Sequence, residues 1–368
     1  MEVYWIFYII GLTCFIIGYN APEGTQQYAL RYKQFEKRFC AFLFLVVGIF
    51  VMFRDEVLDT YMYVSVFKSL PTSWEYVSLY LQNSHFESGF IIVQFLLKKF
   101  ITTDHYYWFG FVATISLIPL YQRLKSWSNQ LGFATFLFIA GTSFTWLING
   151  MRQYIVVCLL FYFSIWLIKG DRIRFIITII LLSLIHKSVL ISLPIYLIIS
   201  TKKIFSWSLL LIIILTIVGI IYSDTVLGAA MTALEVDYSH ALENGKGASF
   251  MRFLVVAVPS ILIIFNLKKI RTIATRQIVL AANLSVVGAC FMLAAVFTNG
   301  ILIGRLPSYF TVYNLYLLPW LIKNCFPATH KIIAWICVIF YTVFFYFQMC
   351  IAWKGLPYVS NFLNLYLT

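Results

Sequence analysis

Residues 204–222 read IFSWSLLLIIILTIVGIIY, a run without a single charged side chain. A run of about 18 or more apolar residues forms a helix long enough to cross the hydrocarbon core of a bilayer. Similar runs recur along the chain, for example over 331–352, and only 11% of all residues are charged against about 25% in an ordinary soluble domain. Backbone polar groups inside lipid must bond within their own segment, so each run predicts a helix. The fold class expected is therefore all-α, a polytopic transmembrane helical bundle.

We expect about twelve spans, in the range of about 11 to 14, within a single integral membrane domain that covers residues 1–368. No polar stretch between the runs is long enough for a core of its own. The expected spans are 1–19, 39–53, 106–122, 131–148, 153–168, 173–185, 187–200, 204–222, 250–267, 277–298, 308–322 and 331–352.

Lys and Arg are unevenly divided between the two sets of loops that these spans define. One set holds 17 of the 27 basic residues and only three of the 14 acidic ones, which are Glu23, Glu36 and Asp171. Cytoplasmic loops carry the excess of Lys and Arg, so this set is predicted to be cytoplasmic and both termini to be extracytoplasmic. The net charge of +13 follows from this bias and does not indicate a nucleic-acid partner.

The outer face is expected to carry two longer segments, over 54–105 and 223–250. Within the first, residues 86–100 (FESGFIIVQFLLKKF) are apolar but short, and they end in two lysines. Counting them as a span would move every later loop to the opposite side of the membrane, and the basic residues would no longer gather on one side. We therefore expect a helix in the outer interface.

Several cations of the outer face stand at span ends: Arg54, Arg152, Lys187, Arg252 and Arg305. Such residues often extend toward lipid phosphates, and that interpretation stays open for each of them. Arg152, however, lies between Asn149 and Gln153 in LINGMRQYIV (147–156), and a membrane anchor needs no amides beside it. Guanidinium groups bind phosphate through paired hydrogen bonds, so these positions are candidates for a diphosphate-binding cavity.

Candidates for a general base are fewer. His186 lies in a mostly apolar segment, and an imidazole can titrate near neutral pH. The adjacent Lys187 favours its neutral, proton-accepting form. Glu87 and Asp59 are competing candidates, and aromatic residues such as Tyr61 could pack against sugar rings or belong to an interfacial belt.

Taken in order, these motifs resemble the Wzy-type repeat-unit polymerases of bacterial surface polysaccharides, in particular the EpsG-like branch. The matching stretches are Arg54 with Asp59 and Tyr61, then Glu87-Ser88-Gly89-Phe90, then Asn149-Gly150-Met151-Arg152-Gln153, then His186 with Ser188, and finally Arg305 with Tyr309 and Phe310.

The resemblance implies a membrane glycosyltransferase that joins oligosaccharide units carried on undecaprenyl diphosphate, at the outer face of the bacterial cytoplasmic membrane. A flippase and a chain-length regulator of the same pathway would be its partners. Arg152 and Arg305, supported by Arg54, would hold the diphosphate, and His186, Glu87 or Asp59 would activate the acceptor hydroxyl. Asn149, Gln153, Lys187, Arg252, Tyr61 and Tyr309 are expected to contact the substrate.

No metal or cofactor is expected, because the seven cysteines are scattered singly and neither a phosphate-binding loop nor a dinucleotide-binding fingerprint occurs. Two other classes remain open. A flippase of lipid-linked oligosaccharides would also need a basic cavity, and a membrane-bound O-acyltransferase could use Asn149 and His186 as its polar pair.

Overall fold

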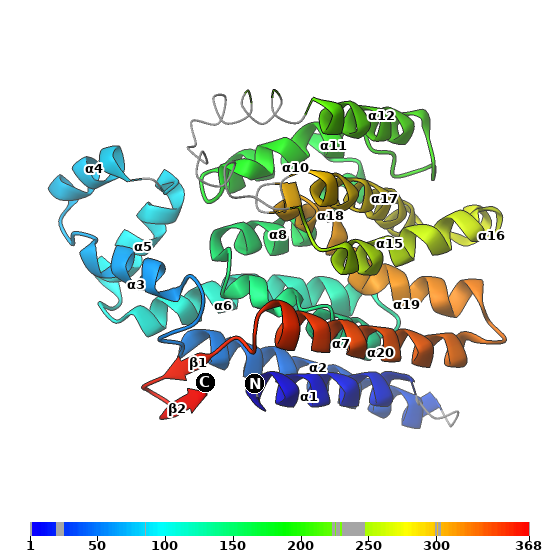
Figure 1. The fold of residues 1–368 in the computed structure, drawn as a ribbon, viewed down its shortest axis with the longest axis horizontal. Coiled ribbons are helices and arrows are strands. Elements are labelled where there is room, and N and C mark those ends of the chain that lie inside the picture. The colour runs from blue at the N-terminus through cyan, green and yellow to red at the C-terminus, as the bar shows by residue number, and fades with distance from the viewer. Residues whose placement is uncertain are drawn as a thin grey trace. The chain divides into compact units, whose positions relative to one another are not determined.

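The computed structural model describes residues 2–19, 26–84, 86–222, 247–298 and 303–367, together with the single positions 225, 229 and 300. Most of the second expected outer segment, 223–250, lies outside the described residues. Within them the chain is helical apart from one small hairpin, so the prediction of an all-α fold is confirmed (Figure 1).

The chain forms two compact units, which are described separately. Unit 1 comprises Met1–Tyr162, Leu181–His186 and Trp335–Thr368, and unit 2 comprises Phe163–Ile180 and Lys187–Ala334. Helices α10 (Arg172–Ser183) and α20 (His330–Tyr346) each contribute residues to both units.

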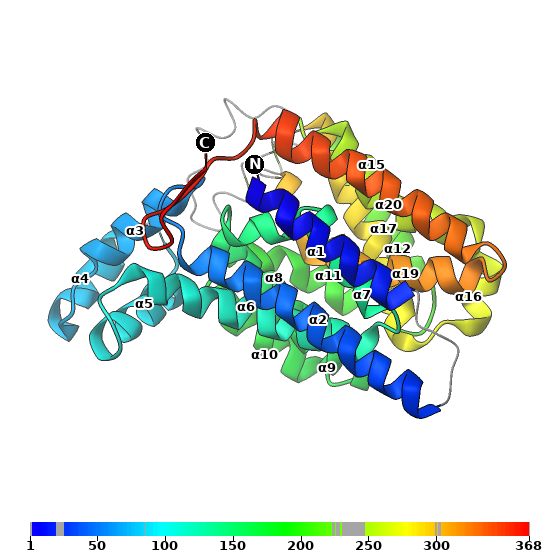
Figure 2. The same cartoon turned by 90° about the horizontal axis from the view of Figure 1, so that it is seen from below.

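Unit 1 is built around long apolar helices. Helix α1 (Glu2–Tyr19) packs along α7 (Leu131–Ala140) and against α2 (Gln26–Met52), and α2 in turn packs along α6 (His105–Trp127). The two ends of the chain lie beside one another in both views (Figures 1 and 2). Aromatic pairs fill the contact between α1 and α7, for example Phe15 with Phe133 and Tyr8 with Phe136. The remaining elements of the unit, in chain order, are α3 (Thr60–Ser69), α4 (Trp74–Asn83), α5 (Ser88–Phe100), η1 (Ser143–Leu147), α8 (Met151–Phe163), η4 (Phe347–Ala352), β1 (Tyr358–Ser360) and β2 (Leu365–Leu367).

Unit 2 has α17 at its centre, with α15 and α12 packed against it. Helix α17 is apolar nearly all round and most of its residues are buried, as expected for the central helix of a bundle. The elements of the unit are α9 (Ile165–Lys169), η2 (Lys187–Ile191), α11 (Ser192–Ile198), α12 (Trp207–Ile221), α15 (Phe250–Phe265), α16 (Leu267–Ile273), α17 (Arg276–Phe297), η3 (Ile303–Arg305), α18 (Ser308–Thr311) and α19 (Asn314–Cys325).

Four helical stretches of the described chain are long and apolar enough to cross a membrane: Glu2–Tyr19, Met151–Lys169, Arg276–Phe297 and His330–Ala352. A fifth is counted if α15 and α16, which meet at an angle of 83°, form one broken span. Several apolar helices of this kind define a multi-pass membrane protein. The expected number of about twelve spans stays a prediction, because helices such as α7 and α11 are shorter than the runs that contain them.

Two local features differ from the expectation. Helix α2 begins at Gln26, so Arg31, Lys33, Lys37 and Arg38 lie on a helix rather than in a loop, since nothing between Gln26 and the apolar run breaks a helix. The chain also ends in an antiparallel hairpin, β1–β2, that was not expected. The apolar segment 86–100 does form a single helix, α5, which begins at Ser88.

Candidate functional site

Glu87, Arg152 and His186 meet in unit 1, although 65 and 99 residues of sequence separate Glu87 from the other two. One carboxylate oxygen of Glu87, Oε2, forms an ion pair with Arg152 Nη1. The other, Oε1, lies 3.0 Å from His186 Nδ1. The side chains of Glu87 and His186 are 10% and 9% exposed and that of Arg152 is 18% exposed. We call these three residues the Glu87 cluster.

The position of Glu87 depends on a close approach between the start of α5 and the end of α10. The backbone N–H of Phe90 donates to the carbonyl oxygen of Leu184 at 3.2 Å. A Cβ atom at Gly89 would lie 2.7 Å from both Cβ and the carbonyl oxygen of Leu184, closer than real Cβ contacts come. Only glycine therefore allows α5 to begin beside the segment that carries His186.

Arg152 is positioned by the turn that precedes α8. Gly150 has φ +83°, in the left-handed region that glycine adopts without strain, and its carbonyl oxygen accepts the N–H of Tyr154 in the first turn of α8. The guanidinium of Arg152 lies over the ring of Phe86, 4.2 Å from its centroid. Stacking on an aromatic ring and pairing with a carboxylate are typical of a guanidinium held in one orientation.

The neighbours of Arg152 on this motif are placed differently. Gln153 is buried, and Asn149 is half-buried with its backbone N–H bonded to the carbonyl oxygen of Thr145 at 2.9 Å. Their expected contact with substrate stays a prediction.

The charges of the Glu87 cluster balance when His186 is neutral. A Glu87 carboxylate paired with the guanidinium would accept a hydrogen bond from a neutral imidazole that carries its proton on Nδ1. That tautomer leaves Nε2 as the basic nitrogen of the ring. The cluster therefore combines an imidazole held through Nδ1 with a guanidinium that has further N–H donors besides the one used by Glu87.

Arg54 has a different environment from the one expected for a diphosphate ligand. It is completely buried, with Nε donating to Thr60 Oγ1 at 3.0 Å and Nη1 to the carbonyl oxygen of Val51 at 3.1 Å. Its guanidinium carbon lies 3.9 Å from the centroid of the Phe109 ring, and Nη2 lies 3.4 Å from Sδ of Met151. Burial lowers the pKa of Arg54 to about 9, so the group stays charged at neutral pH. These contacts favour a structural role, because they link the end of α2 to the residue that precedes Arg152.

Asp59 and Tyr61 flank the start of α3. The Asp59 carboxylate makes no capping bond to the helix, and its negative charge partly offsets the lowering of the Arg54 pKa. The side chain of Tyr61 is 83% exposed. Neither residue lies in the Glu87 cluster, and their expected roles in catalysis and binding stay predictions.

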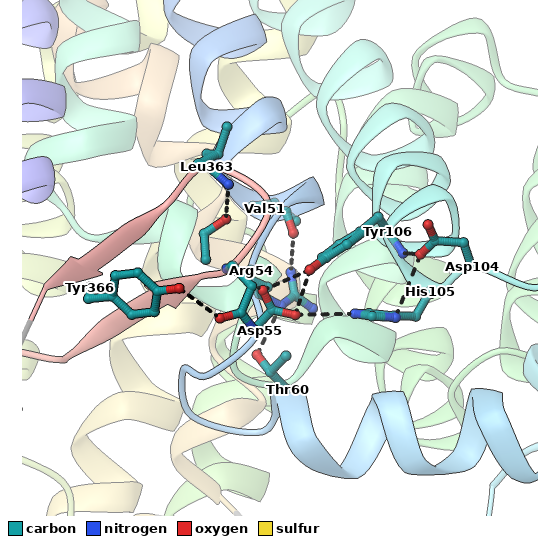
Figure 3. A network of polar contacts seen from close by, with 11 residues as sticks. Val51, Arg54, Asp55, Thr60, Asp104, His105, Tyr106, Leu363 and Tyr366 are labelled. Atoms are coloured by element: carbon teal, nitrogen blue, oxygen red, sulfur yellow. Dashed lines mark hydrogen bonds and ion pairs between the residues drawn. The ribbon is translucent and has the colours of Figure 1, made fainter.

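A second polar network surrounds Asp55, next to Arg54 in sequence (Figure 3). The Asp55 carboxylate accepts from the hydroxyl of Tyr106, 2.8 Å from each oxygen, and from the backbone N–H of Asn361 at 2.7 Å. His105 Nε2 lies 3.5 Å from the same carboxylate. Burial lowers the pKa of His105, although the neighbouring carboxylates oppose this shift.

This network joins the C-terminal hairpin to the segment that follows α2. The N–H groups of Asp55 and Glu56 both donate to the carbonyl oxygen of Val359, and Tyr358 stacks on Phe50 with ring centroids 4.0 Å apart. Sequence reasoning missed the hairpin. The signal that could have revealed it is the pair of short segments rich in aromatic and aliphatic residues, YVS and LYL, on either side of the turn residues in NFLN.

The remaining expected site residues belong to unit 2. Tyr309 is buried, its hydroxyl lies 2.7 Å from Ser188 Oγ, and its carbonyl oxygen accepts from the hydroxyl of Tyr196. Arg305 ends η3, and its carbonyl oxygen accepts from Ser308 Oγ at 2.7 Å. Lys187 begins η2 and Arg252 lies in the first turn of α15; both are half-buried. The structure joins the Ser188 and Tyr309 motifs within unit 2, and the roles of all these residues stay predictions.

Together, the apolar helices and the Glu87 cluster define a multi-pass membrane protein with a carboxylate, a guanidinium and an imidazole gathered from three separate sequence motifs. Residues 37–360 match the EpsG family, and the chain belongs to that family. The resemblance to EpsG-like proteins is therefore confirmed. No curated protein and no solved structure matches the chain.

Proposed function

We propose that this protein is a glycosyltransferase that polymerises lipid-linked oligosaccharide units into a bacterial surface polysaccharide. The substrate class is an oligosaccharide carried on undecaprenyl diphosphate. The observation that carries the proposal is the Glu87 cluster, because it joins an oriented base to a cation, the two groups that such a transfer needs.

In the proposed reaction, a hydroxyl oxygen of the acceptor unit attacks the anomeric carbon of the growing glycan. The new carbon–oxygen bond forms as the bond from that carbon to the diphosphate oxygen breaks, and undecaprenyl diphosphate leaves with the bonding electrons. His186 takes the proton of the acceptor hydroxyl on Nε2, while Glu87 holds Nδ1–H and stabilises the imidazolium. Arg152 stabilises the negative charge that develops on the leaving diphosphate.

Arg54 is assigned a supporting part that follows from its contacts. Its bond to Met151 and its burial hold the start of α8, so it acts on Arg152 through the backbone rather than on the diphosphate directly. Arg305 stays in the proposal as a second cation for the diphosphate, and Asp59 as a less favoured base.

The experiment is a polymerisation assay with the purified protein in lipid nanodiscs and its lipid-linked oligosaccharide. We expect long glycans with the unchanged protein, and a loss of at least about 100-fold with Arg152→Ala, since one donor to a developing oxyanion contributes about 10²–10³ in rate. Arg174→Ala is a suitable control, because Arg174 pairs with Asp171 at an exposed position.

Two further variants refine the assignment. His186→Gln should abolish elongation and Arg305→Ala should reduce it, while the protein stays folded and inserted. A flippase would move the lipid-linked unit across the bilayer without lengthening its glycan, so transport without elongation by the unchanged protein would overturn the proposal.

A further inference from the structure

A cavity of about 630 Å³ lies in unit 2, between the loop that joins α11 to α12 and the helix α16. Its volume is within the range of about 300–1,000 Å³ that is usual for small-molecule sites. Three of its lining residues are cations, Lys202, Lys203 and Arg271, and none is acidic. It lies apart from the Glu87 cluster in the sequence and shares no residue with it.

The loop that carries the two lysines is fixed by hydrogen bonds to the buried side chain of Asn283 and to Ser200. Asn283, on α17, is completely buried; its Nδ2 donates to the carbonyl oxygens of Ser200 and Lys203 at 2.9 Å each. Its Oδ1 accepts the N–H of Phe205 at 3.2 Å. Ser200 Oγ accepts the N–H groups of Lys202 and Lys203. The lysines are therefore presented by a constrained backbone, so the cavity is a preformed feature of the fold.

The cations of this cavity have no acidic partner in the part of the chain that the structure describes. No ion pair of that part involves Lys202, Lys203 or Arg271. Like charges brought together around one hollow repel one another, and an anion placed between them relieves the repulsion. The guanidinium of Arg271 can bind phosphate oxygens through paired hydrogen bonds, and the two lysines attract them as point charges.

The surface next to the cavity is apolar, which favours a lipid over a soluble phosphate compound as the ligand. Leu210 lines the cavity, and Ile214, Ile217 and Ile221 continue from it along one face of α12 at the spacing of helical turns. All four side chains are exposed, as is Trp207 at the cavity rim, which is 85% exposed. A polar hollow that opens onto an apolar helix face matches a lipid, whose headgroup and acyl chains need these two surroundings in this order.

We propose that this cavity binds the phosphate headgroup of an anionic membrane lipid, with the acyl chains along the exposed face of α12. Basic pockets between helices on the cytoplasmic side of membrane proteins bind anionic headgroups in this way. The excess of Lys and Arg predicts that the loop with Lys202 and Lys203 is cytoplasmic, the side where Trp207 would lie at the headgroup level. The proposal does not depend on glycosyl transfer.

The test is lipid retention by the purified, delipidated protein, measured by native mass spectrometry during titration with phosphatidylglycerol or with phosphatidylcholine. The unchanged protein should bind phosphatidylglycerol in preference. The triple variant Lys202→Gln, Lys203→Gln, Arg271→Gln should bind it roughly 100-fold more weakly, because each cation near an anionic lipid contributes about a factor of five in affinity. Lys268→Gln is the control, since Lys268 is exposed on α16, the helix that carries Arg271, but does not line the cavity.

Two further measurements identify the source of the phosphate group. Phosphatidylglycerol with brominated acyl chains should quench tryptophan fluorescence less in Trp207→Phe than in the unchanged protein, which places the chains beside α12. Inorganic phosphate should not displace the lipid at millimolar concentration. Displacement at that concentration would identify a soluble phosphate compound as the ligand and overturn the lipid assignment. Equal binding of the two lipids, or an unchanged affinity in the triple variant, would overturn the site itself.

Discussion

Replacing Gly89 by Ala tests whether the contact between α5 and Leu184 builds the Glu87 cluster. Two effects of opposite sign compete. Ala is favoured over Gly inside a helix by roughly 0.5–1 kcal/mol, which would stabilise α5. The new Cβ, however, would lie 2.7 Å from the backbone oxygen of Leu184, and a backbone atom cannot rotate out of the way. Overpacking of this kind costs about 1–3 kcal/mol, so the net loss lies between about 0 and 2.5 kcal/mol, and we expect the variant to be less stable by about 1 kcal/mol.

The displacement can also be estimated. Restoring a separation of 3.4 Å, the start of ordinary contact, requires a shift of about 0.7 Å between the two segments. The bond from the Phe90 N–H to the Leu184 oxygen, now 3.2 Å long, would then exceed the limit of about 3.5 Å. Glu87 and His186 would separate by a similar amount, and a misplacement of about 1 Å can cost about 10²-fold in rate. We expect a loss of polymerisation of roughly 10- to 100-fold.

The assay combines the apparent melting temperature in detergent with the rate of glycan elongation. Gly48→Ala is a matched control in the same unit, because its Cβ would meet Leu117 Cδ1 at 3.6 Å, an ordinary contact. The control should keep the rate of the unchanged protein. A Gly89→Ala variant that is as stable and as active as the unchanged protein would refute the assigned role of this contact.

Two other contacts of unit 1 give predictions that do not depend on catalysis. Asp55→Asn should loosen the C-terminal hairpin, because the amide loses the negative charge and one of the two acceptor oxygens that bind the Tyr106 hydroxyl and the N–H of Asn361. Faster proteolysis of residues 358–367 would show this, and unchanged cleavage would contradict it. Arg54→Lys should lower the melting temperature and reduce the free energy of unfolding by about 1–3 kcal/mol. Lys cannot reproduce the bonds to Thr60 and Val51, so their acceptor oxygens lose a donor. A variant as stable as the unchanged protein would show that these bonds contribute little.

Much of the fold could be predicted from the sequence, because apolar runs without charge have one stable conformation in lipid. The candidate site could be predicted only in part. Arg152, His186 and Glu87 are each indicated by the sequence, with Glu87 as an alternative base to His186. Their contact in one cluster was not predicted, because 65 and 99 residues separate Glu87 from the other two, and their roles stay predictions.

Arg54 shows where this reasoning ends. An arginine just beyond an apolar run looks the same in sequence whether it faces a ligand or is enclosed by protein. Its enclosure depends on Thr60, Phe109 and Met151, and the last of these is 97 residues away. The Asp55 network depends in the same way on a hairpin 306 residues further along the chain. Contacts of this range follow from the packing of helices, which a local pattern does not encode.

The charge balance of the Glu87 cluster leads to a further prediction. With His186 neutral, the positive charge of Arg152 is offset by Glu87, so a diphosphate must compete with that carboxylate for the guanidinium. Glu87→Gln removes the competing charge, and polyprenyl diphosphate should then bind more tightly, by roughly 10- to 100-fold, since a hydrogen bond to a charged group contributes about 1.5–3 kcal/mol.

The same variant should be nearly inactive, because a neutral amide neither fixes the Nδ1 tautomer of His186 nor stabilises its imidazolium. Isothermal titration with a polyprenyl diphosphate measures the affinity, and the elongation assay measures the rate; Arg152→Ala, as the reference, should lose both. Tighter binding together with a lost rate would indicate that Glu87 orients His186 and competes with the diphosphate for Arg152. Weaker binding by Glu87→Gln would show instead that Glu87 holds Arg152 in place for the ligand, and the competition between carboxylate and diphosphate would have to be abandoned.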